Sequence, residues 1–245
     1  MEWRDRGIVL GVRKQGETSV VLELMTATHG RHLGLVRGGR SRRLRAVLQP
    51  GNLVEVNWRA RLDEHLGFMT VEPLALRAAL LMESAMALQA VQLLAAHARL
   101  LPERDNNPRL FALLDETISH LDEPALGAIG LFRFEVAMLE ELGFGLDLDS
   151  CAAGGRDDDL AFVSPRTGRA VSREKGEPYA DKLLPYPALL RAGRNALPDA
   201  DDLAEAFRTT GYFFARHVWE PRNLVEPDAR PAVVAAFRRR QPALV

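Results

Sequence analysis

Five short segments in the first 76 residues of the chain have the hydrophobic patterns of β-strands: residues 7–16 are an apolar run that ends in a turn, and residues 18–26, 30–38 and 52–62 alternate between hydrophobic and polar positions. The alternation is clearest in residues 52–62, where Val54, Val56 and Trp58 fall on one face of an extended strand and polar residues fall between them. Glycine and proline separate the segments. The pattern therefore predicts five β-strands at short, regular spacing. They lie within residues 7–16, 18–26, 30–38, 52–62 and 66–76.

Residues 41–49, between the third and fourth predicted strands, are long enough for one or two turns of helix. In such a helix Arg42 and Arg45 share one face, and we expect Leu44 and Val47 to face the strands. Five strands with a short helix between the third and the fourth follow the order of an OB-fold barrel.

Helical periodicity replaces the strand pattern after Pro73. Residues 77–101 are rich in alanine and leucine and contain no glycine or proline, which predicts one helix of about six turns. Further helices are predicted in residues 109–121, 124–143, 197–219 and 228–240. Between them, residues 145–180 are rich in loops, with short strand candidates at 160–163 and 170–171. The fold class is α+β: an OB-fold domain in residues 1–77 and a larger, mostly α-helical domain in residues 78–245.

Charge is divided unevenly along this 245-residue chain, whose formal net charge is only −1. Residues 1–77 carry a net charge of +5, and residues 78–245 carry −6. No acidic residue lies between Glu23 and Glu55, whereas six arginines do. A basic domain of this kind indicates a polyanionic partner, although a solvated charged face is the other reading of such a run.

The sequence lacks the residue sets that enzymes and metal sites require. It has no phosphate-binding loop that ends in Gly-Lys-Ser/Thr and no Gly-x-Ser-x-Gly elbow. His29 and His32 are three residues apart with no third ligand nearby, so we expect them to be solvated or to face phosphate. The single cysteine, Cys151, excludes an internal disulfide. We expect a binding protein with no catalytic residue, no metal and no cofactor.

No long apolar run predicts a transmembrane helix, and the first residues do not follow the pattern of a signal peptide. We therefore expect a cytoplasmic protein that has no membrane partner.

Arginine is suited to phosphate because its planar guanidinium donates two parallel hydrogen bonds. We therefore expect nucleic acid to contact the arginine segment and the basic residues of the neighbouring strands. Aromatic residues are few: we expect Trp58 and Phe68 in the core and Trp3 to be the freest to stack on a base. Phosphate contacts should then dominate, with low sequence specificity. The predicted DNA-binding residues are Arg37, Arg40, Arg42, Arg43, Arg45, Arg13, Lys14 and Arg59.

Two longer stretches carry a family resemblance. The first reads GIVLGVRKQGETSVVLELMTATHGRHLGLVRGGRSRR and continues with LQPGNLVEV; the second reads LFRFEVAMLEELGFGLDLDSCAAGG and continues with FVSPRTGRAVS. Together they resemble the RecO family of bacterial recombination mediators, nearly end to end and in the same order. The resemblance implies an OB-fold domain joined to a helical domain. It also implies binding of single- and double-stranded DNA, annealing of complementary strands, and a nucleoid-associated role in DNA repair.

The resemblance also implies protein partners: the acidic C-terminal tail of single-stranded DNA-binding protein (SSB), RecR and, indirectly, RecA. Arg133 falls where the family's helical domain is basic near its SSB-tail pocket; it is otherwise an ordinary helix-surface residue or the partner of a nearby acid. Many family members bind zinc through four cysteines, but here Gly154 replaces the second and the remaining pair is missing. We expect no zinc and a degenerate, zinc-finger-like insertion held by packing of Leu160, Phe162 and Val163. A second hypothesis is an adaptor whose helical domain binds the SSB tail or RecR while the barrel serves as a scaffold.

Overall fold

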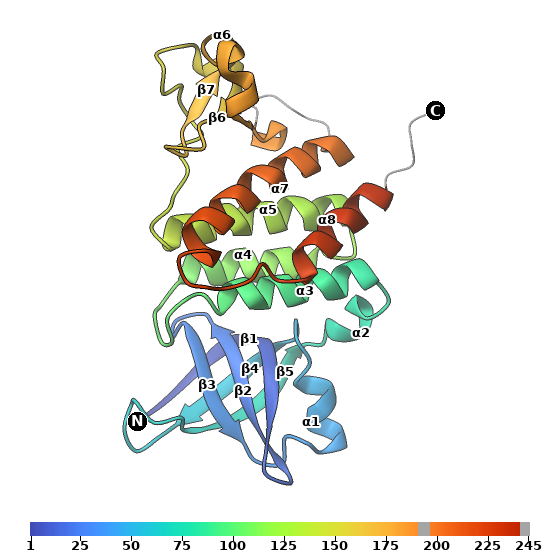
Figure 1. Ribbon diagram of the computed structural model, residues 1–245. Helices are drawn as coiled ribbons and strands as arrows, with labels where there is room; N and C mark the ends of the chain where they lie inside the picture. Colours follow the sequence, from blue (N-terminus) through green and yellow to red (C-terminus); the bar gives the residue numbers. More distant parts are fainter. Residues whose placement is uncertain (191–196, 241–245) are drawn as a thin grey trace. The chain divides into compact units, whose positions relative to one another are not determined.

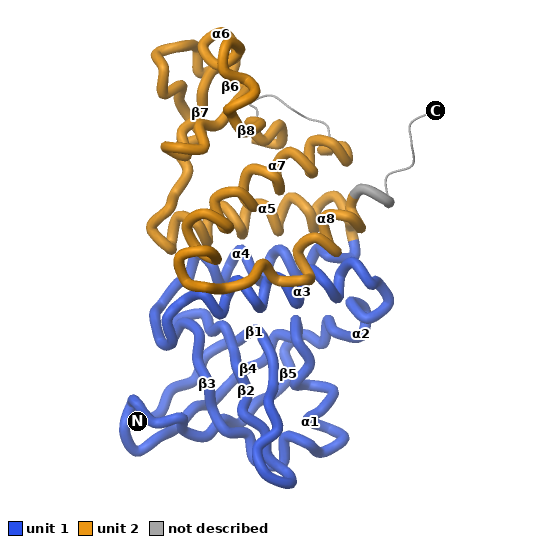
Figure 2. The backbone as a smooth tube through the Cα atoms, in the orientation of Figure 1, with its two compact units in different colours: residues 1–122 blue, residues 123–245 orange. Residues whose placement is uncertain are grey.

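The computed structural model describes residues 1–190 and 197–240 of the chain (Figure 1). Its contacts divide the chain into two compact units, Met1–Asp122 and Glu123–Val245 (Figure 2). The strands of the first unit end at Ala75, so the first unit contains the predicted barrel and also the helices that directly follow it. None of the helices in the described residues combines the length and the apolar character that a membrane span needs.

The first unit is built on a closed barrel of five strands with the spatial order β1-β2-β3-β5-β4. Helix α1, Arg42–Val47, lies between β3 and β4 in the chain. The predicted five strands and intervening helix are therefore confirmed, and the barrel is OB-like. The strands are β1 Glu2–Gln15, β2 Ser19–Thr26, β3 Arg31–Val36, β4 Leu53–Arg59 and β5 Phe68–Ala75.

The barrel core follows the alternation of β4. Val54, Val56 and Trp58 are fully buried, as the sequence pattern predicts. The Trp58 indole Nε1–H donates to the Leu66 carbonyl at 3.0 Å, so the buried ring loses no hydrogen bond. The prediction for Phe68 is wrong: its side chain is 37% exposed. The neighbouring Met69 takes the core position on β5, which turns Phe68 to the opposite face.

The single long helix predicted in residues 77–101 is also wrong. The structure has a short helix α2, Ala78–Leu81, and a separate helix α3, Ala85–Ala98. Ser84 between them is extended, and its side chain accepts a hydrogen bond from the backbone N–H of Ala87. A serine at this position stops the first helix and caps the second, which alanine and leucine content alone does not reveal. Helix α4, Pro108–Ser119, completes the first unit.

Polar contacts tie the barrel to the end of α3 and the connection that follows it. The Glu23 carboxylate on β2 accepts hydrogen bonds from Arg31 and Arg99, both at 2.8 Å. Arg31 also donates through Nε to the Leu101 carbonyl, and its own carbonyl accepts from the Arg104 backbone N–H. These contacts attach residues 99–104 to the barrel within the first compact unit.

In its described residues, the second unit contains three long helices, α5 Pro124–Glu141, α7 Ala200–Phe214 and α8 Ala229–Arg240. One turn of π-helix, Ala215–Trp219, continues directly from α7. The fully buried Glu135 of α5 accepts hydrogen bonds from Arg230 of α8 and Thr210 of α7. Burial alone would lower the pKa of Arg230, but the adjacent Glu135 and Glu226 carboxylates raise it above its usual value. The three helices are thus joined through one satisfied buried ion pair.

A small three-stranded sheet of order β7-β6-β8 lies in the loop-rich part of the second unit. The two predicted strand candidates are confirmed as β6 Leu160–Val163 and β7 Ala170–Ser172, and β8 is Leu184–Pro185. Leu160 and Val163 are buried, and Phe162 is partly buried. The remaining short segments are η1 Asp157–Asp159, α6 Arg173–Gly176, η2 Glu177–Lys182 and η3 Ala188–Leu190.

Candidate nucleic-acid interface

Helix α1 is anchored to the barrel by its apolar side chains. Val47 is buried and Leu44 packs against the barrel core, as the sequence predicts. The Ser41 hydroxyl caps the helix by accepting from the Leu44 backbone N–H. The arginines on the other faces of this helix are all exposed. Because its apolar side is packed on the barrel, the short helix points Arg42, Arg43 and Arg45 toward the solvent in different directions.

The glycine pair before α1 lets the basic loop lie close to the barrel. Gly38 has a φ of +65°, a conformation that glycine adopts without strain. A Cβ atom on Gly39 would lie 2.4 Å from a methyl group of Val20 on β2. Larger residues at these two positions would strain or displace the loop, which carries Arg37 before the glycine pair and Arg40 after it.

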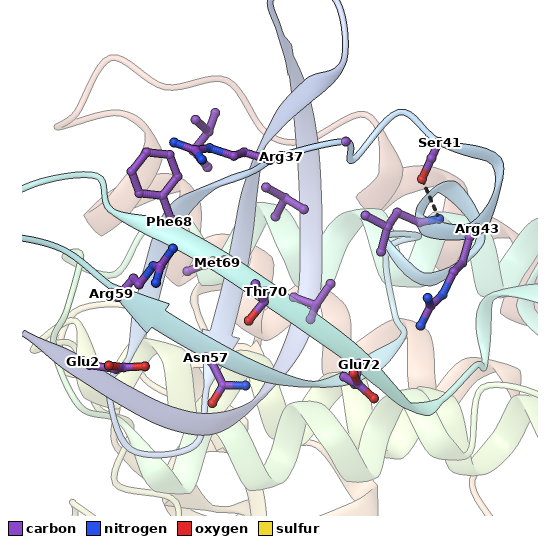
Figure 3. A pocket seen from close by; sticks show the side chains of 15 residues that line it. Glu2, Arg37, Ser41, Arg43, Asn57, Arg59, Phe68, Met69, Thr70 and Glu72 are labelled. Carbon is purple, nitrogen blue, oxygen red and sulfur yellow. Dashed lines mark hydrogen bonds between the residues drawn. The ribbon is translucent and has the colours of Figure 1, made fainter.

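A cavity of about 640 Å³, here called the Phe68 groove, lies between α1 and strands β4 and β5 (Figure 3). Arg37 enters from the loop after β3, Arg43 from α1 and Arg59 from the end of β4. In Figure 3 the Arg37 side chain lies over the Phe68 ring, and the Arg37 guanidinium carbon is 4.4 Å from the ring centroid. The groove is also lined by Glu2, Leu35, Val36, Gly38, Ser41, Leu44, Asn57, Met69, Thr70, Val71 and Glu72.

Two further hollows adjoin α1, and neither is lined by an acidic residue. Lys14, Arg40 and Arg45 line a cavity of about 420 Å³. Arg42 and Arg45 line another of about 730 Å³, whose opposite wall is apolar. The Arg40 guanidinium already donates to the Glu17 and Gly16 carbonyls of the β1–β2 turn, so part of its hydrogen-bonding capacity holds the loop.

The structure thus brings seven of the eight predicted DNA-binding residues to three adjacent hollows around α1. The eighth, Arg13, is exposed on β1 but lines none of these three. Phe68, Asn57 and Thr70 also line the Phe68 groove, although they are not among the residues predicted from the sequence. A signal for them exists: Phe68 and Thr70 alternate with the apolar Met69 and Val71 on β5, which places Phe68 on the polar face.

The predictions for Trp3 and His32 are wrong, because both belong to an aromatic cluster at one end of the barrel. Trp3 is only partly exposed and stacks on His29 at 4.2 Å and on Trp58 at 5.5 Å between ring centroids. His32 is 2% exposed, so it faces neither water nor phosphate. His29 bonds to the Asp5 carboxylate at 2.9 Å. Trp3 is therefore not free to stack on a base.

Arg133 is exposed on α5 and forms no hydrogen bond or ion pair with any described residue. Its acidic neighbour Glu135 points into the unit, where it is occupied by Arg230. Among the described residues, Arg133 therefore forms no ion pair with Glu135, which was one of the alternatives that the sequence left open.

The surroundings of Cys151 do not fit a zinc ion. The Cys151 sulfur accepts backbone N–H hydrogen bonds from Ser172 at 3.2 Å and Gly155 at 3.3 Å. It is the only cysteine of the chain, and no group of three suitable ligands exists among the described residues. Desolvation raises the pKa of this thiol, but the hydrogen bonds from Ser172, Ala153 and Gly155 outweigh it and lower the pKa to about 7.

The chain has a five-stranded OB-like barrel with an arginine-rich helix, and further helices and a small inserted sheet follow the barrel in the chain. This arrangement defines a class of two-domain proteins with a basic N-terminal surface. The chain belongs to the RecO family. Residues 1–77 match the family model for the Recombination protein O N terminal, and residues 87–224 match that for the Recombination protein O C terminal.

Relatives of similar length share this family. A protein named DNA repair protein RecO from Chelativorans sp. (strain BNC1) is 61% identical over 242 residues, which cover 99% of this chain and 98% of the relative. The proteins of the same name from Mesorhizobium japonicum and Rhizobium etli (strain CIAT 652) are each 56% identical, over 98% and 100% of this chain and 94% and 96% of their own lengths.

Proposed function

We propose that this protein is a non-catalytic DNA-binding mediator of recombination in DNA repair. The observation that carries the proposal is α1, a helix anchored by Leu44 and Val47 that exposes Arg42, Arg43 and Arg45 within a segment free of acidic residues. Its membership of a family whose relatives are named DNA repair proteins supports the same role.

The arrangement of the arginines supports strand annealing. Arg43 lines the Phe68 groove, whereas Arg45 lines the two hollows on the other sides of α1. Phosphates of two strands can therefore be neutralised on different sides of one helix, which reduces the repulsion between the strands as their bases pair. Guanidinium groups bind phosphate without reading the base sequence, so annealing is expected for any complementary pair.

The helical unit is proposed to bring the protein to SSB-coated DNA. Arg133 supports this role because it is exposed and is not neutralised by any described residue. A carboxylate-rich SSB tail is the kind of partner that such an arginine pairs with. We propose that RecR binds the same protein and that recombinase loading, and thus the effect on RecA, follows from DNA binding and SSB docking together.

The inserted sheet is proposed to be a zinc-finger-like element without its metal. Its support is Cys151, whose sulfur receives two backbone N–H groups as a metal-bound thiolate often does. Packing of Leu160 and Val163 and the Tyr186 hydroxyl bond to the Leu148 carbonyl take over the task of holding the loops.

The salt dependence of DNA binding tests the phosphate contacts. Replacing Arg42, Arg43 and Arg45 together by alanine removes three positive charges and keeps good helix formers in α1. Each lost phosphate contact should flatten the slope of log affinity against log salt by about 0.7 on single strands, so the triple variant should lose about 2. The measurement is titration of a labelled single-stranded oligonucleotide at several salt concentrations.

A matched control removes the same charge elsewhere. Arg166, Lys182 and Arg208 are exposed in the second unit, and their joint replacement by alanine should leave the slope unchanged. Equal slopes for the wild type and the α1 variant would contradict the proposal.

A further inference from the structure

Phe68 is an exception on the barrel surface. It is an aromatic residue at the start of β5, and 37% of its surface is exposed to solvent. Its chain neighbour Met69 packs in the core, so barrel packing does not require an aromatic ring at position 68. The ring forms an aromatic surface inside a groove that is lined by both charged and apolar side chains.

We propose that the Phe68 groove binds an unpaired nucleobase of single-stranded DNA, stacked on the Phe68 ring. The inference rests on the proposed DNA binding and adds a site that selects single strands. In a duplex the faces of each base are covered by its neighbours, so a stacking platform of one ring is open only to a base that has left the stack.

Arg37 covers the ring and can move away from it. Its guanidinium carbon lies 4.4 Å from the ring centroid, which leaves no room for a base between the two groups. The Arg37 side chain is exposed, and its guanidinium forms no hydrogen bond or ion pair with a described residue, so it can rotate away from the ring. A base that stacks on the Phe68 ring displaces the Arg37 side chain. The displaced guanidinium can then pair with a phosphate of the same DNA strand.

Polar groups on the groove floor can bond the base edge without selecting one base. Asn57 on β4 and Thr70 on β5 are register partners, and neither side chain forms a hydrogen bond with a described residue. An amide offers both donors and an acceptor, and a hydroxyl can act as either. Such a pair accepts the edges of different bases, which agrees with a protein that anneals without sequence preference.

The charged residues that line the groove favour an uncharged base over a phosphate at the floor of the groove. Arg43 and Arg59 approach from α1 and β4, whereas Glu2 and Glu72 also line the cavity (Figure 3). The two carboxylates repel phosphate, and the arginines attract it. The backbone of the strand therefore follows the arginines, and the uncharged base is the part that fits beside Glu2 and Glu72.

The test separates bases from phosphates by comparing three labelled probes. They are a thymidine oligonucleotide of about 12 residues, a chain of equal length made of abasic residues, and a duplex of the same length. The wild type should bind the thymidine strand roughly five- to 100-fold more tightly than the abasic strand. Phe68→Leu, which keeps an apolar side chain, should lose roughly fivefold or more of that preference, with the abasic and duplex affinities unchanged.

Two further variants control the result. Phe68→Tyr should keep the preference, because it keeps the ring. Leu74→Ala truncates another exposed apolar residue of β5, outside the groove, and should also keep the preference. A wild-type ratio near one, or a Phe68→Leu ratio equal to that of the wild type, overturns the base site and leaves the groove as a phosphate or protein surface.

The outcome for the base site is distinguishable from that for the proposed function. If the α1 triple variant weakens all three probes while Phe68→Leu behaves as the wild type, phosphate binding stands and the base site fails. If the α1 triple variant binds all three probes as the wild type does, the phosphate proposal fails whatever the result at Phe68.

Discussion

His32 is the residue at which burial has the clearest chemical effect. Its ring makes edge contacts with Trp3 and Trp58 at 5.0 Å between centroids, and neither ring nitrogen has a hydrogen-bond partner among the described residues. Desolvation lowers its pKa most, and the positive charge of Arg104 lowers it further, to about 4. Asp63 opposes the shift but does not reverse it. The imidazole is therefore neutral in the folded protein near neutral pH.

This histidine should make stability depend on pH. An unfolded histidine has a pKa near 6.5, so in the window between about pH 6.5 and about pH 4 the unfolded chain takes up a proton that the folded chain does not. Stability is then fully present above the window and falls as the pH drops through it, by about 2 kcal/mol between pH 7.5 and pH 5. Urea unfolding of the full chain at several pH values measures the effect.

His32→Phe keeps a ring in the cluster and removes the titration, so its stability should fall less over the same range. His65→Gln, at an exposed histidine, serves as the control and should retain the wild-type dependence. A His32→Phe protein with an unchanged pH dependence would refute the assignment.

Single residues also mark where sequence reasoning fails. Trp58 could be placed in the core because its neighbours alternate regularly along β4. Hydrophobicity alone places Phe68 in the core, although the alternation along β5 turns it to the polar face. Polarity alone places His32 at the surface, although the register of β3 buries it. At both positions the register overrides the usual preference of the residue type.

At the scale of elements, the buried contact between Glu135 and Arg230 joins α5 to α8, and Thr210 adds α7. Arg230→Met should lower the free energy of unfolding by about 3–5 kcal/mol, because it leaves the Glu135 carboxylate buried without its cation. The double variant Glu135→Leu with Arg230→Met removes both charges and should recover most of that loss. Urea unfolding measures both.

Arg208→Met, on the exposed face of α7, is the matched control and should change the free energy of unfolding by less than about 0.5 kcal/mol. If the double variant is as unstable as Arg230→Met alone, the cost arises from packing and not from an unpaired charge.

Most elements could be predicted because their periodicity is strong. Strands β2, β3 and β4 follow a period-2 pattern, β1 contains an apolar run, and helices α4, α5, α7 and α8 follow helical patterns. The break between α2 and α3 could not be predicted from composition, since it depends on one side-chain hydrogen bond of Ser84. The π-helical turn after α7, in which Val218 and Trp219 are buried, is not distinguished from an α-helix by the hydrophobic periodicity of the sequence.

At the scale of the whole molecule, the residues proposed to bind DNA and the residue proposed to bind the SSB tail belong to different units, and we expect the two activities to be separable. Arg133→Ala should abolish or strongly weaken binding of an SSB-tail peptide and leave the salt dependence of DNA binding unchanged, because Arg133 is far in sequence from α1 and belongs to the second unit. The α1 triple variant should show the reverse. Peptide titration and oligonucleotide titration on the same preparations give the two readouts.

Annealing of SSB-coated strands should need both surfaces. Each variant should anneal such strands more slowly than the wild type, and Arg133→Ala should anneal bare strands normally. Slow annealing of bare strands by Arg133→Ala would show that this residue serves DNA binding and not docking.

The positive charge of the candidate site could be predicted from the sequence, but the shape of the site could not. The run of arginines without an acid predicts a polyanion surface directly from the sequence. The Phe68 groove depends on barrel closure, which brings the β3–α1 loop, the end of β4 and the start of β5 together. Contacts between residues so far apart in the chain require the three-dimensional fold.

The hydrogen bonds around Cys151 have a practical consequence. A thiol with a pKa of about 7 is roughly half ionised at neutral pH, and the thiolate is the form that reacts with alkylating reagents. Because the chain has no other cysteine, a maleimide dye will attach at one position without any substitution. That position is in the loop before β6 of the second unit, so the native protein can carry a fluorescent reporter far in sequence from the arginines of α1.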